Sequence, residues 1–242
     1  MNKFALHTAT NYVGTHMALR GCINDWYNFQ KLDKELGITN PANVINLIGT
    51  AYKRNLVLEA LDHLTTMAQP GDFVLWSNSS HGIQVRNPYS LEQDFIDEAL
   101  VDNDGNLIVD DEIGEAISRF KKGVTVNVWL DNCYAGTMDR HCRLDNWHVI
   151  QRKVACDVVM LLGCRENQTS ADACIKGVYQ GAMTHYSLEV IKRYNKELTY
   201  RDLLERTNGM LLVNRFPQVA QMAVSSADML NKKIFTTIQV KD

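Results

Sequence analysis

A histidine and a cysteine stand out in the 242-residue sequence because each closely follows a run of apolar residues. His81 comes shortly after the run Phe73–Trp76, and Cys133 comes shortly after Val124–Leu130. An imidazole that takes the proton of a thiol produces a nucleophile able to attack carbonyl carbons at neutral pH. Small residues beside each of them, including Gly82, would leave backbone N–H groups free to bind an oxyanion. The pair therefore predicts acyl-transfer chemistry.

Each of these residues has a plainer explanation when it is taken alone. A histidine after a buried strand is more often a hydrogen-bonded structural residue, and a cysteine in such a loop is more often a small apolar one. Their coincidence at two predicted strand ends favours the catalytic interpretation, because a base and a nucleophile then reach comparable positions in the fold.

A scaffold that brings strand ends together is predicted by the apolar pattern. Six apolar runs read as strands, and they alternate with helical periodicity over 18–37, 56–67, 113–120, 181–194 and 200–213. This alternation predicts an α/β fold with a mostly parallel sheet of about six strands and helices on both faces. Active sites in such sheets lie beyond the carboxyl ends of the strands. The predicted strands are Phe4–Ala9, Val44–Ile48, Phe73–Trp76, Val124–Leu130, Asp157–Leu162 and Pro217–Val224.

Composition and charge exclude several classes of protein. The 25 Lys and Arg residues against 28 Asp and Glu give a net charge of -3, without the basic excess of a general nucleic-acid binder. No apolar run is long enough to span a bilayer, and the N-terminus is too polar for a signal peptide. The six cysteines have no zinc-type spacing. We therefore expect a cytoplasmic protein with reduced thiols that binds neither nucleic acid nor membrane.

Acidic residues are concentrated in one segment. Ten of them lie between Glu92 and Glu115, and this segment contains no Lys or Arg. Concentrated negative charge in a globular chain calls for a cation, a basic partner or solvent. Within the segment, Asn103-Asp-Gly-Asn106 is typical of a hairpin turn.

Several motifs resemble those of caspase-like cysteine peptidases, and more closely those of metacaspases and their bacterial relatives, the orthocaspases. They occur in family order, cover nearly the whole chain, and include the spacing of about 50 residues between histidine and cysteine that caspases have. Two departures from the usual family motifs are Ser80 and Tyr134. The similar segments are Ala18–Asp25, Ala68–Asp72, Ser79–Gly82, Asp97-Glu98, Gly105–Glu112, Asp131–Gly136, Gly163–Asp172 and Gly181–Thr184.

This resemblance implies a caspase-like three-layer sandwich formed by one peptidase domain over residues 1–242, with no prodomain. Its large-subunit-like part would cover about 1–138, a connecting loop about 139–154, and the small-subunit-like part about 155–242. Self-cleavage by an enzyme specific for basic residues could occur in the connecting region, although an ordinary surface loop is the alternative. By analogy with metacaspases we expect a monomer. The basic residues of the region are Arg140, Arg143, Arg152 and Lys153, and His141, Cys142 and His148 are interpreted as loop residues rather than a metal site.

The resemblance also implies catalytic roles. Cys133 would be the nucleophile, and His81 would be the general base that later protonates the leaving amine. The backbone N–H groups of Gly82 and Cys133 would form the oxyanion hole, and a backbone carbonyl would orient His81.

The substrate pocket implied by the resemblance is lined by Asp25 and Asp131, with Cys22 and Ser79 beside them. Two buried carboxylates repel each other unless a cation arrives, so this pocket would accept Arg or Lys before the scissile bond and reject acidic residues. Without the resemblance, Asp25 could equally be a solvated helix residue and Asp131 a turn or cap residue.

A calcium site is implied by the resemblance to calcium-dependent metacaspases. Its ligands would be Asp97, Asp110 and Asp111, with Asp139 as the fourth, and binding would activate the enzyme by ordering the catalytic loop. A solvated acidic face is the alternative. The sequence as a whole predicts a calcium-responsive cysteine endopeptidase acting after Arg or Lys in protein or peptide substrates. A non-catalytic scaffold and a caspase-like peptidase of different specificity remain as alternative hypotheses.

Overall fold

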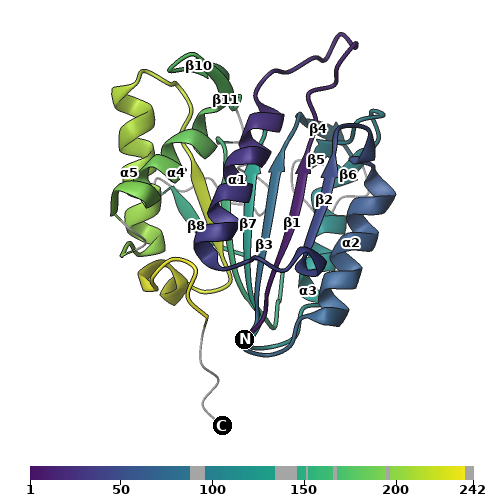
Figure 1. Cartoon of the computed structure of the whole chain (residues 1–242), viewed down its shortest axis with the longest axis vertical. Helices are drawn as coiled ribbons and strands as arrows, with labels where there is room; N and C mark the ends of the chain where they lie inside the picture. The colour runs from purple at the N-terminus through teal and green to yellow at the C-terminus, as the bar shows by residue number, and fades with distance from the viewer. Residues whose placement is uncertain (88–95, 134–145, 151, 166–167, 195–196, 238–242) are drawn as a thin grey trace.

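A central sheet of seven strands forms the middle of the computed structural model, which describes residues 1–87, 96–133, 146–150, 152–165, 168–194 and 197–237 (Figure 1). Five strands are parallel to one another, β12 runs antiparallel to β9, and β8 lies parallel to β12 at the edge. In spatial order the strands are β2 (Val44–Ile48), β1 (Lys3–Ala9), β3 (Phe73–Ser79), β7 (Thr125–Asp131), β9 (Asp157–Leu162), β12 (Gln221–Val224) and β8 (Trp147–Val149).

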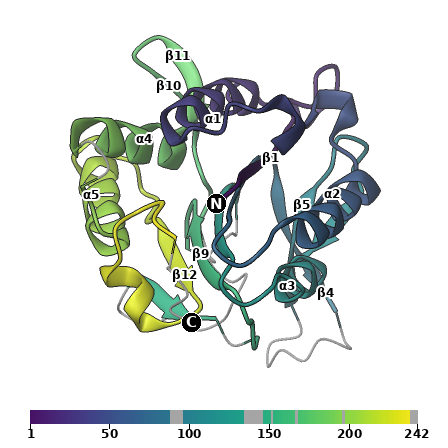
Figure 2. The ribbon, with the colours of Figure 1, turned by 60° about the horizontal axis from the view of Figure 1, so that its bottom comes forward.

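Helices cover both faces of this sheet, as Figure 2 shows. One face carries α1 (Cys22–Leu36), α4 (Ala182–Tyr194) and α5 (Tyr200–Val213), and the other carries α2 (Arg54–Met67) and α3 (Asp110–Ser118). Each side buries its own apolar cluster: Phe29 and Trp129 belong to the first, and Leu64 and Trp76 to the second. The predicted α/β fold, with a mostly parallel sheet between two helical layers, is confirmed.

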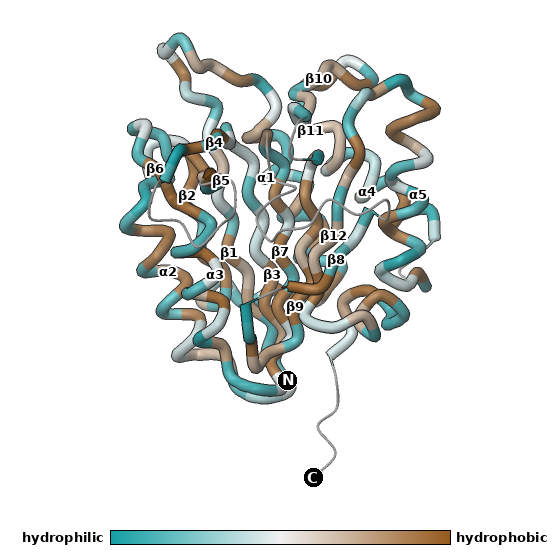
Figure 3. Tube along the Cα trace, turned by 180° about the vertical axis from the view of Figure 1, so that it is seen from behind, coloured by the Kyte–Doolittle hydropathy of each residue, from teal (hydrophilic) through white to brown (hydrophobic). Residues whose placement is uncertain are grey.

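The apolar residues concentrate in the central strands, where Figure 3 shows mostly hydrophobic colours. The third strand nevertheless continues past the predicted end at Trp76 to Ser79, although its last three residues are polar. They are buried because they have partners: Ser77 Oγ lies 2.7 Å from His7 Nδ1, and Asn78 donates to Thr8 at 2.9 Å. The strand therefore delivers His81 two residues after its own end.

Several short elements differ from the prediction. The seventh strand, β8, was not predicted because three residues are too few to give a periodic pattern, and His148 lies in this strand rather than in a loop. The first helix begins at Cys22 rather than at residue 18, and the last strand begins at Gln221 rather than at Pro217. Two small antiparallel sheets were also not predicted: β4 (Gly82–Arg86) with β5 (Ile96–Val101) and β6 (Leu107–Val109), and β10 (Asp172–Ile175) with β11 (Val178–Gly181).

The described residues also contain short 3-10 helices at Pro41–Asn43, Gly49–Ala51 and Ala227–Asn231. The predicted turn over 103–106 is present, where the Asp102 carboxylate accepts the backbone N–H groups of Asp104 and Asn106 at 2.8 Å each. No helix in the described part of the chain is both long and apolar enough to cross a membrane.

Candidate active site

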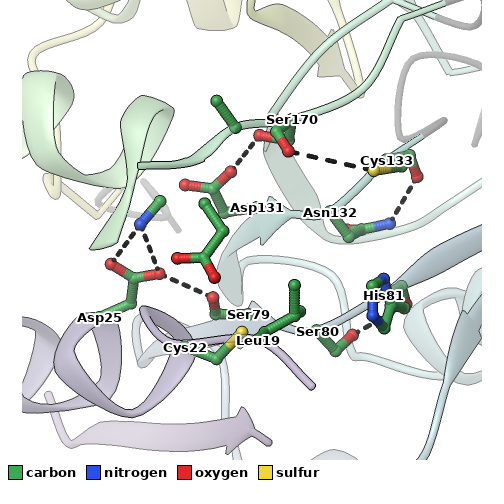
Figure 4. Close-up of a pocket in the computed structure, with 13 residues that line it drawn as sticks. Leu19, Cys22, Asp25, Ser79, Ser80, His81, Asp131, Asn132, Cys133 and Ser170 are labelled. Carbon is green, nitrogen blue, oxygen red and sulfur yellow. Dashed lines mark hydrogen bonds between the residues drawn. The ribbon is translucent and has the colours of Figure 1, made fainter. Parts of the chain in front are cut away.

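The proposed nucleophile and base leave neighbouring strands at the same edge of the sheet. Strands β3 and β7 are parallel, and their register pairs Ser79 with Asp131. Two residues beyond this pair come His81, after β3, and Cys133, after β7. Both residues line one pocket (Figure 4). His81 and Cys133 thus lie beyond neighbouring strand ends and line the same pocket, as the strand pattern predicted.

A backbone carbonyl holds the imidazole of His81 from one side. His81 Nε2 lies 2.7 Å from the carbonyl oxygen of Met17, which belongs to the loop between β1 and α1. A carbonyl can only accept, so Nε2 carries a proton and Nδ1 of the neutral ring is the nitrogen able to take another. The ring is thus prepared to act as a base through Nδ1.

Cys133 is half-buried, and its thiol is the protonated species at neutral pH. Burial raises the pKa of the thiol, and the negative charge of Asp131 raises it further. The carbonyl oxygen of Ser170 lies 4.0 Å from Sγ. Because the thiolate is not favoured in the resting protein, Cys133 needs a proton acceptor such as His81 to become a nucleophile.

Gly82 lies directly against the loop that carries Cys133. A Cβ atom at this position would lie 2.2 Å from the carbonyl oxygen of Cys133 and 2.4 Å from Nδ2 of Asn132. Only glycine permits this approach of the two backbones. The proposed oxyanion-hole residues are therefore neighbours, as their predicted shared role requires.

Two buried carboxylates form the floor of the pocket, and neither is a solvated helix or turn residue. Asp25 is 1% exposed and accepts hydrogen bonds from Ser79 Oγ at 2.7 Å and from the N–H of Gly181 at 3.0 Å. Asp131 is 6% exposed and accepts the N–H of Thr184 at 2.8 Å. The hydroxyl of Ser170 also donates to Asp131.

The start of α4 stabilises both carboxylates. Gly181 immediately precedes this helix and Thr184 lies in its first turn, so their N–H groups belong to the positive end of the helix dipole. The carboxylates also fill the space that a side chain at Gly181 would need, since a Cβ there would lie 2.2 Å from Asp131 Oδ2. The pocket thus combines residues from distant parts of the sequence.

Electrostatic repulsion remains despite these hydrogen bonds. Burial raises the pKa of Asp25 well above its ordinary value, and the charge of Asp131 raises it further. Burial likewise raises the pKa of Asp131. Cys22 lines the same pocket, where burial and the charge of Asp25 raise the pKa of its thiol. A cation entering the pocket would relieve the unfavourable burial of negative charge.

Ser170 was not identified from the sequence as a site residue. It joins the two halves of the site, because its hydroxyl binds Asp131 while its carbonyl faces Cys133. Gln218 supports it by donating to Ser170 Oγ at 3.0 Å. The motif around Asp172 was recognised, and Ser170 lies within it, but nothing in its residue type singled it out.

Asp172 and Ser80 also line the pocket, and each is held by a hydrogen bond. Asp172 begins strand β10, and it orders the loop before α1 by accepting the N–H of Arg20 at 2.6 Å. Ser80 stands where the family usually has glycine, and its hydroxyl is accommodated by donating to Asn78 Oδ1 at 2.9 Å. The other departure, Tyr134, lies outside the described residues.

The four predicted calcium ligands do not form a complete site in the described part of the chain. Asp139 lies outside it, and among the described residues no three His, Cys, Asp or Glu side chains are placed to hold a metal ion. Asp111 forms an ion pair with Arg152 at 2.7 Å. The other two residues suit a cation better. Asp97 is 3% exposed, and its Oδ1 is buried without a hydrogen-bond partner.

Asp110 has a strongly raised pKa in this acidic group. Burial, followed by the charge of Glu98, raises the pKa of Asp110 to about 8. Glu98 is itself 2% exposed and was not among the predicted ligands. Acidic side chains are thus gathered around Asp110, and a cation beside Asp97 and Asp110 would favour the ionised form of Asp110. Asp111 does not contribute to such a site while it is paired with Arg152.

Of the basic residues in the predicted connecting loop, Arg152 forms the ion pair already described and Lys153 is exposed. Arg140, Arg143, His141 and Cys142 lie outside the described residues. The free thiols of the described residues are Cys22, Cys133, Cys156, Cys164 and Cys174, none of which is in a disulfide.

Comparison with known proteins finds several metacaspases. Metacaspase-1 of Yarrowia lipolytica is 26% identical over 294 residues, covering 96% of this chain and 63% of that protein. Metacaspase-8 of Arabidopsis thaliana is 34% identical over 145 residues, covering 56% and 38% respectively. Metacaspase-3 of Trypanosoma brucei brucei is 26% identical, covering 96% and 74%. The chain thus spans less than two thirds of the length of the first two relatives.

Solved structures with the same fold are also found. A crystal structure of a Geobacter sulfurreducens protein superposes with a TM-score of 0.73 at 22% identity, covering 99% of this chain and 100% of that one. Caspase-1 from Spodoptera frugiperda superposes with a TM-score of 0.57 at 12% identity, covering 91% and 85%. The sequence model of the caspase-domain family matches residues 3–235 of this chain. With nearly its whole length matched, the chain belongs to the caspase-domain family of peptidases.

Proposed function

We propose that this protein is a cysteine endopeptidase of the metacaspase type that cleaves peptide bonds after Arg or Lys in protein or peptide substrates. The observation that carries the proposal is one pocket lined by Cys133, His81, Asp25 and Asp131. A nucleophile and its base thus stand beside a buried negative charge that has no cation of its own among the described residues.

The reaction begins with proton transfer from Cys133 Sγ to Nδ1 of His81. The thiolate attacks the carbonyl carbon of the scissile bond, and the backbone N–H groups of Gly82 and Cys133 stabilise the oxyanion. The imidazolium then protonates the leaving amine, and the acyl-enzyme is hydrolysed by water that His81 deprotonates. Throughout these steps the carbonyl of Met17 accepts a hydrogen bond from the Nε2–H group and stabilises the charged ring.

Selection of a basic side chain follows from the two carboxylates. An arginine or lysine would form charge-assisted hydrogen bonds with Asp25 and Asp131 and would remove the repulsion that raises the pKa of Asp25. An acidic side chain would add a third negative charge to the same buried volume. A preference for basic residues over acidic ones is therefore the expected specificity.

Incubation with fluorogenic peptides ending in Arg, Lys or Asp tests this function. The wild-type protein should release the fluorophore from the Arg and Lys peptides, and Cys133→Ala should release none. Asp131→Asn should weaken cleavage of the basic peptides by about 100-fold in kcat/KM, since it removes a buried charge partner. Absence of any Cys133-dependent cleavage, with or without calcium, would support the non-catalytic scaffold, and unchanged preference in Asp131→Asn would place the specificity pocket elsewhere.

We also propose that calcium binds at the acidic group and activates the enzyme. Asp97 and Asp110 would hold the ion with their carboxylate oxygens, and Asp111 and Asp139 would join them once Asp111 leaves Arg152. The bound ion would supply positive charge beside the acidic side chains Asp97, Glu98 and Asp110 and would favour the ionised form of Asp110. The raised pKa of Asp110 supports this placement.

Isothermal titration of calcium into the Cys133→Ala protein checks the metal site independently of activity. Binding heat should appear with this protein and disappear when Asp110→Ala and Asp111→Ala are added. Retained binding in that variant would mean that other residues hold the ion.

A further inference from the structure

Tyr12 is a buried residue of the loop between β1 and α1. The residue next to it, Val13, is 87% exposed, whereas Tyr12 is 1% exposed. Its aromatic ring packs against the imidazole of His81 with a centroid distance of 4.9 Å. The same loop continues to Met17, whose carbonyl contacts His81 Nε2. One loop therefore touches the histidine at two points.

The hydroxyl of Tyr12 is inserted between two backbone segments. It accepts the backbone N–H of His81 at 3.0 Å and donates to the carbonyl of Val101 at 2.6 Å. In the other direction, the N–H of Val101 donates directly to the carbonyl of His81 at 3.0 Å. Residues facing each other as a hydrogen-bonded antiparallel pair normally exchange both bonds directly. Here one direct bond is made, and the phenol bridges the other.

The register of the small sheet explains why this place matters. Gly82 pairs with Leu100, so His81 and Val101 would form the next step of the β4–β5 ladder. The inserted Tyr12 hydroxyl holds the backbone segments of His81 and Val101 apart at this step. His81 is thereby kept out of a regular strand at the edge of the pocket that Figure 4 shows.

The backbone of Tyr12 is arranged for this insertion. Its φ angle is 48°, a left-handed conformation that bulky residues rarely adopt and that persists only where surrounding contacts enforce it. Such contacts are present, because Thr10 Oγ1 accepts the N–H of Tyr12 at 3.2 Å and the Tyr12 carbonyl accepts the N–H of Thr15 at 3.1 Å. Burial raises the pKa of the phenol, so it stays protonated and remains a donor to Val101.

We propose that Tyr12 is a positioning residue for catalysis: its phenol bridges His81 and Val101 and its ring packs on the imidazole, which fixes the base relative to Cys133. This inference rests on the proposed peptidase function. It assigns to the loop before α1 a role beyond the carbonyl of Met17, because the phenol fixes the main chain of His81 while the carbonyl fixes its ring.

Tyr12→Phe tests the proposal because it keeps the ring and removes only the bridge. Without the hydroxyl, the His81 N–H and the Val101 carbonyl either lack partners or close to a direct bond, and both outcomes move the histidine. We expect kcat for the best Arg or Lys peptide to fall about tenfold, with KM changed less than twofold, since small misplacements of a catalytic group are costly.

Tyr200→Phe is the matched control. The Tyr200 phenol is also 1% exposed, accepts the backbone N–H of Phe235 at 3.0 Å and donates to Asn127 Oδ1 at 2.6 Å, but it does not contact His81. Both variants should lose similar thermal stability, and only Tyr12→Phe should lose kcat. Equal kcat values for Tyr12→Phe and the wild type would overturn the proposal.

Alkylation of Cys133 by iodoacetamide provides a second readout that does not need the substrate pocket. The rate in Tyr12→Phe should fall toward that of His81→Ala, because thiolate formation depends on the base. A rate equal to the wild type would also overturn the proposal. An inactive wild-type protein that still alkylates faster than His81→Ala would instead overturn the proposed peptidase function and leave the positioning of His81 intact.

Discussion

Gly82 is a site residue at which an added side chain would collide with backbone. Replacing it with alanine would place Cβ 2.2 Å from the carbonyl oxygen of Cys133, which cannot be relieved by moving a flexible side chain. The loop carrying the nucleophile must shift instead. For Gly82→Ala we expect kcat to fall by about 100-fold or more, since displacement of a catalytic group has effects of this size.

Steady-state kinetics with a basic peptide checks this prediction, and Gly209→Ala is the control. Gly209 lies in α5 with nothing within 4 Å of an added Cβ, so alanine there should leave kcat unchanged. It should also stabilise the helix by up to about 1 kcal/mol. Full activity in Gly82→Ala would mean that the close approach of the two backbones is not required.

Asp110 should make the stability of the protein depend on pH when calcium is absent. Its pKa in the folded protein is about 8, whereas an unfolded chain gives an ordinary value near 3.8. The folded state therefore binds more protons between these values, and its stability falls as pH rises from about 4 to 8. In Asp110→Asn this part of the fall should be missing.

Urea unfolding in the presence of a chelator at pH 5 and pH 8 measures the effect. The wild-type protein should lose more unfolding free energy between the two pH values than Asp110→Asn does. Identical losses would show that Asp110 keeps an ordinary pKa in the folded protein. Added calcium should reduce the wild-type loss, because a cation favours the ionised carboxylate.

At the scale of elements, helix α1 is joined to the sheet by a buried polar network. His7 of β1 is 0% exposed, and its Nε2 lies 2.7 Å from Asp33 of α1 while its Nδ1 lies 2.7 Å from Ser77 of β3. The same helix carries Cys22 and Asp25 in its first turns. The network therefore fixes the helix that supplies part of the pocket.

Replacing His7 should destabilise the protein and disturb the pocket at a distance. His7→Leu leaves Asp33 and Ser77 buried without this partner, and we expect a loss of about 2–4 kcal/mol in unfolding free energy. Chemical denaturation measures the loss, and KM for basic peptides should rise as α1 moves. His63→Leu is the control, because His63 is exposed on α2. This substitution should change the unfolding free energy by less than about 0.5 kcal/mol. A similarly small change in His7→Leu would contradict the role of the network.

For the whole molecule, we propose a monomer in solution. Strand β8 pairs with β12 and covers the edge of the sheet that β12 would otherwise present to a second copy. Sedimentation equilibrium should give a mass near 27.5 kDa across the accessible concentration range. A mass twice this value would mean that the short β8 does not prevent pairing, or that the opposite edge at β2 is used.

The sequence was informative where residues repeat with a period and where chemistry depends on residue type. Six of the seven sheet strands and the five helices of the described residues were predicted in this way, and so was the placement of His81 and Cys133 beyond neighbouring strand ends. Strand β8 was too short to give a pattern. The resemblance implied that a backbone carbonyl orients His81, and Met17 supplies one. Neither Met17 nor Ser170 could be named from the sequence, because both act through backbone carbonyls, which every residue type possesses. The carboxylate pair of Asp25 and Asp131 was found only through family resemblance, because aspartates are equally common at solvated helix positions and in turns.

The order of strands in the sheet has a consequence for a chain that is cut in its middle. Strands β7 and β9 are paired along six residue positions, although they precede and follow the segment around residues 134–146. Asp25 and Asp131 come from before that segment, whereas Gly181 and Thr184, which bind them, come from after it. A single break there would leave two fragments held by one continuous sheet, and each would supply what the other lacks. The two pieces should purify together as a noncovalent pair with an intact pocket.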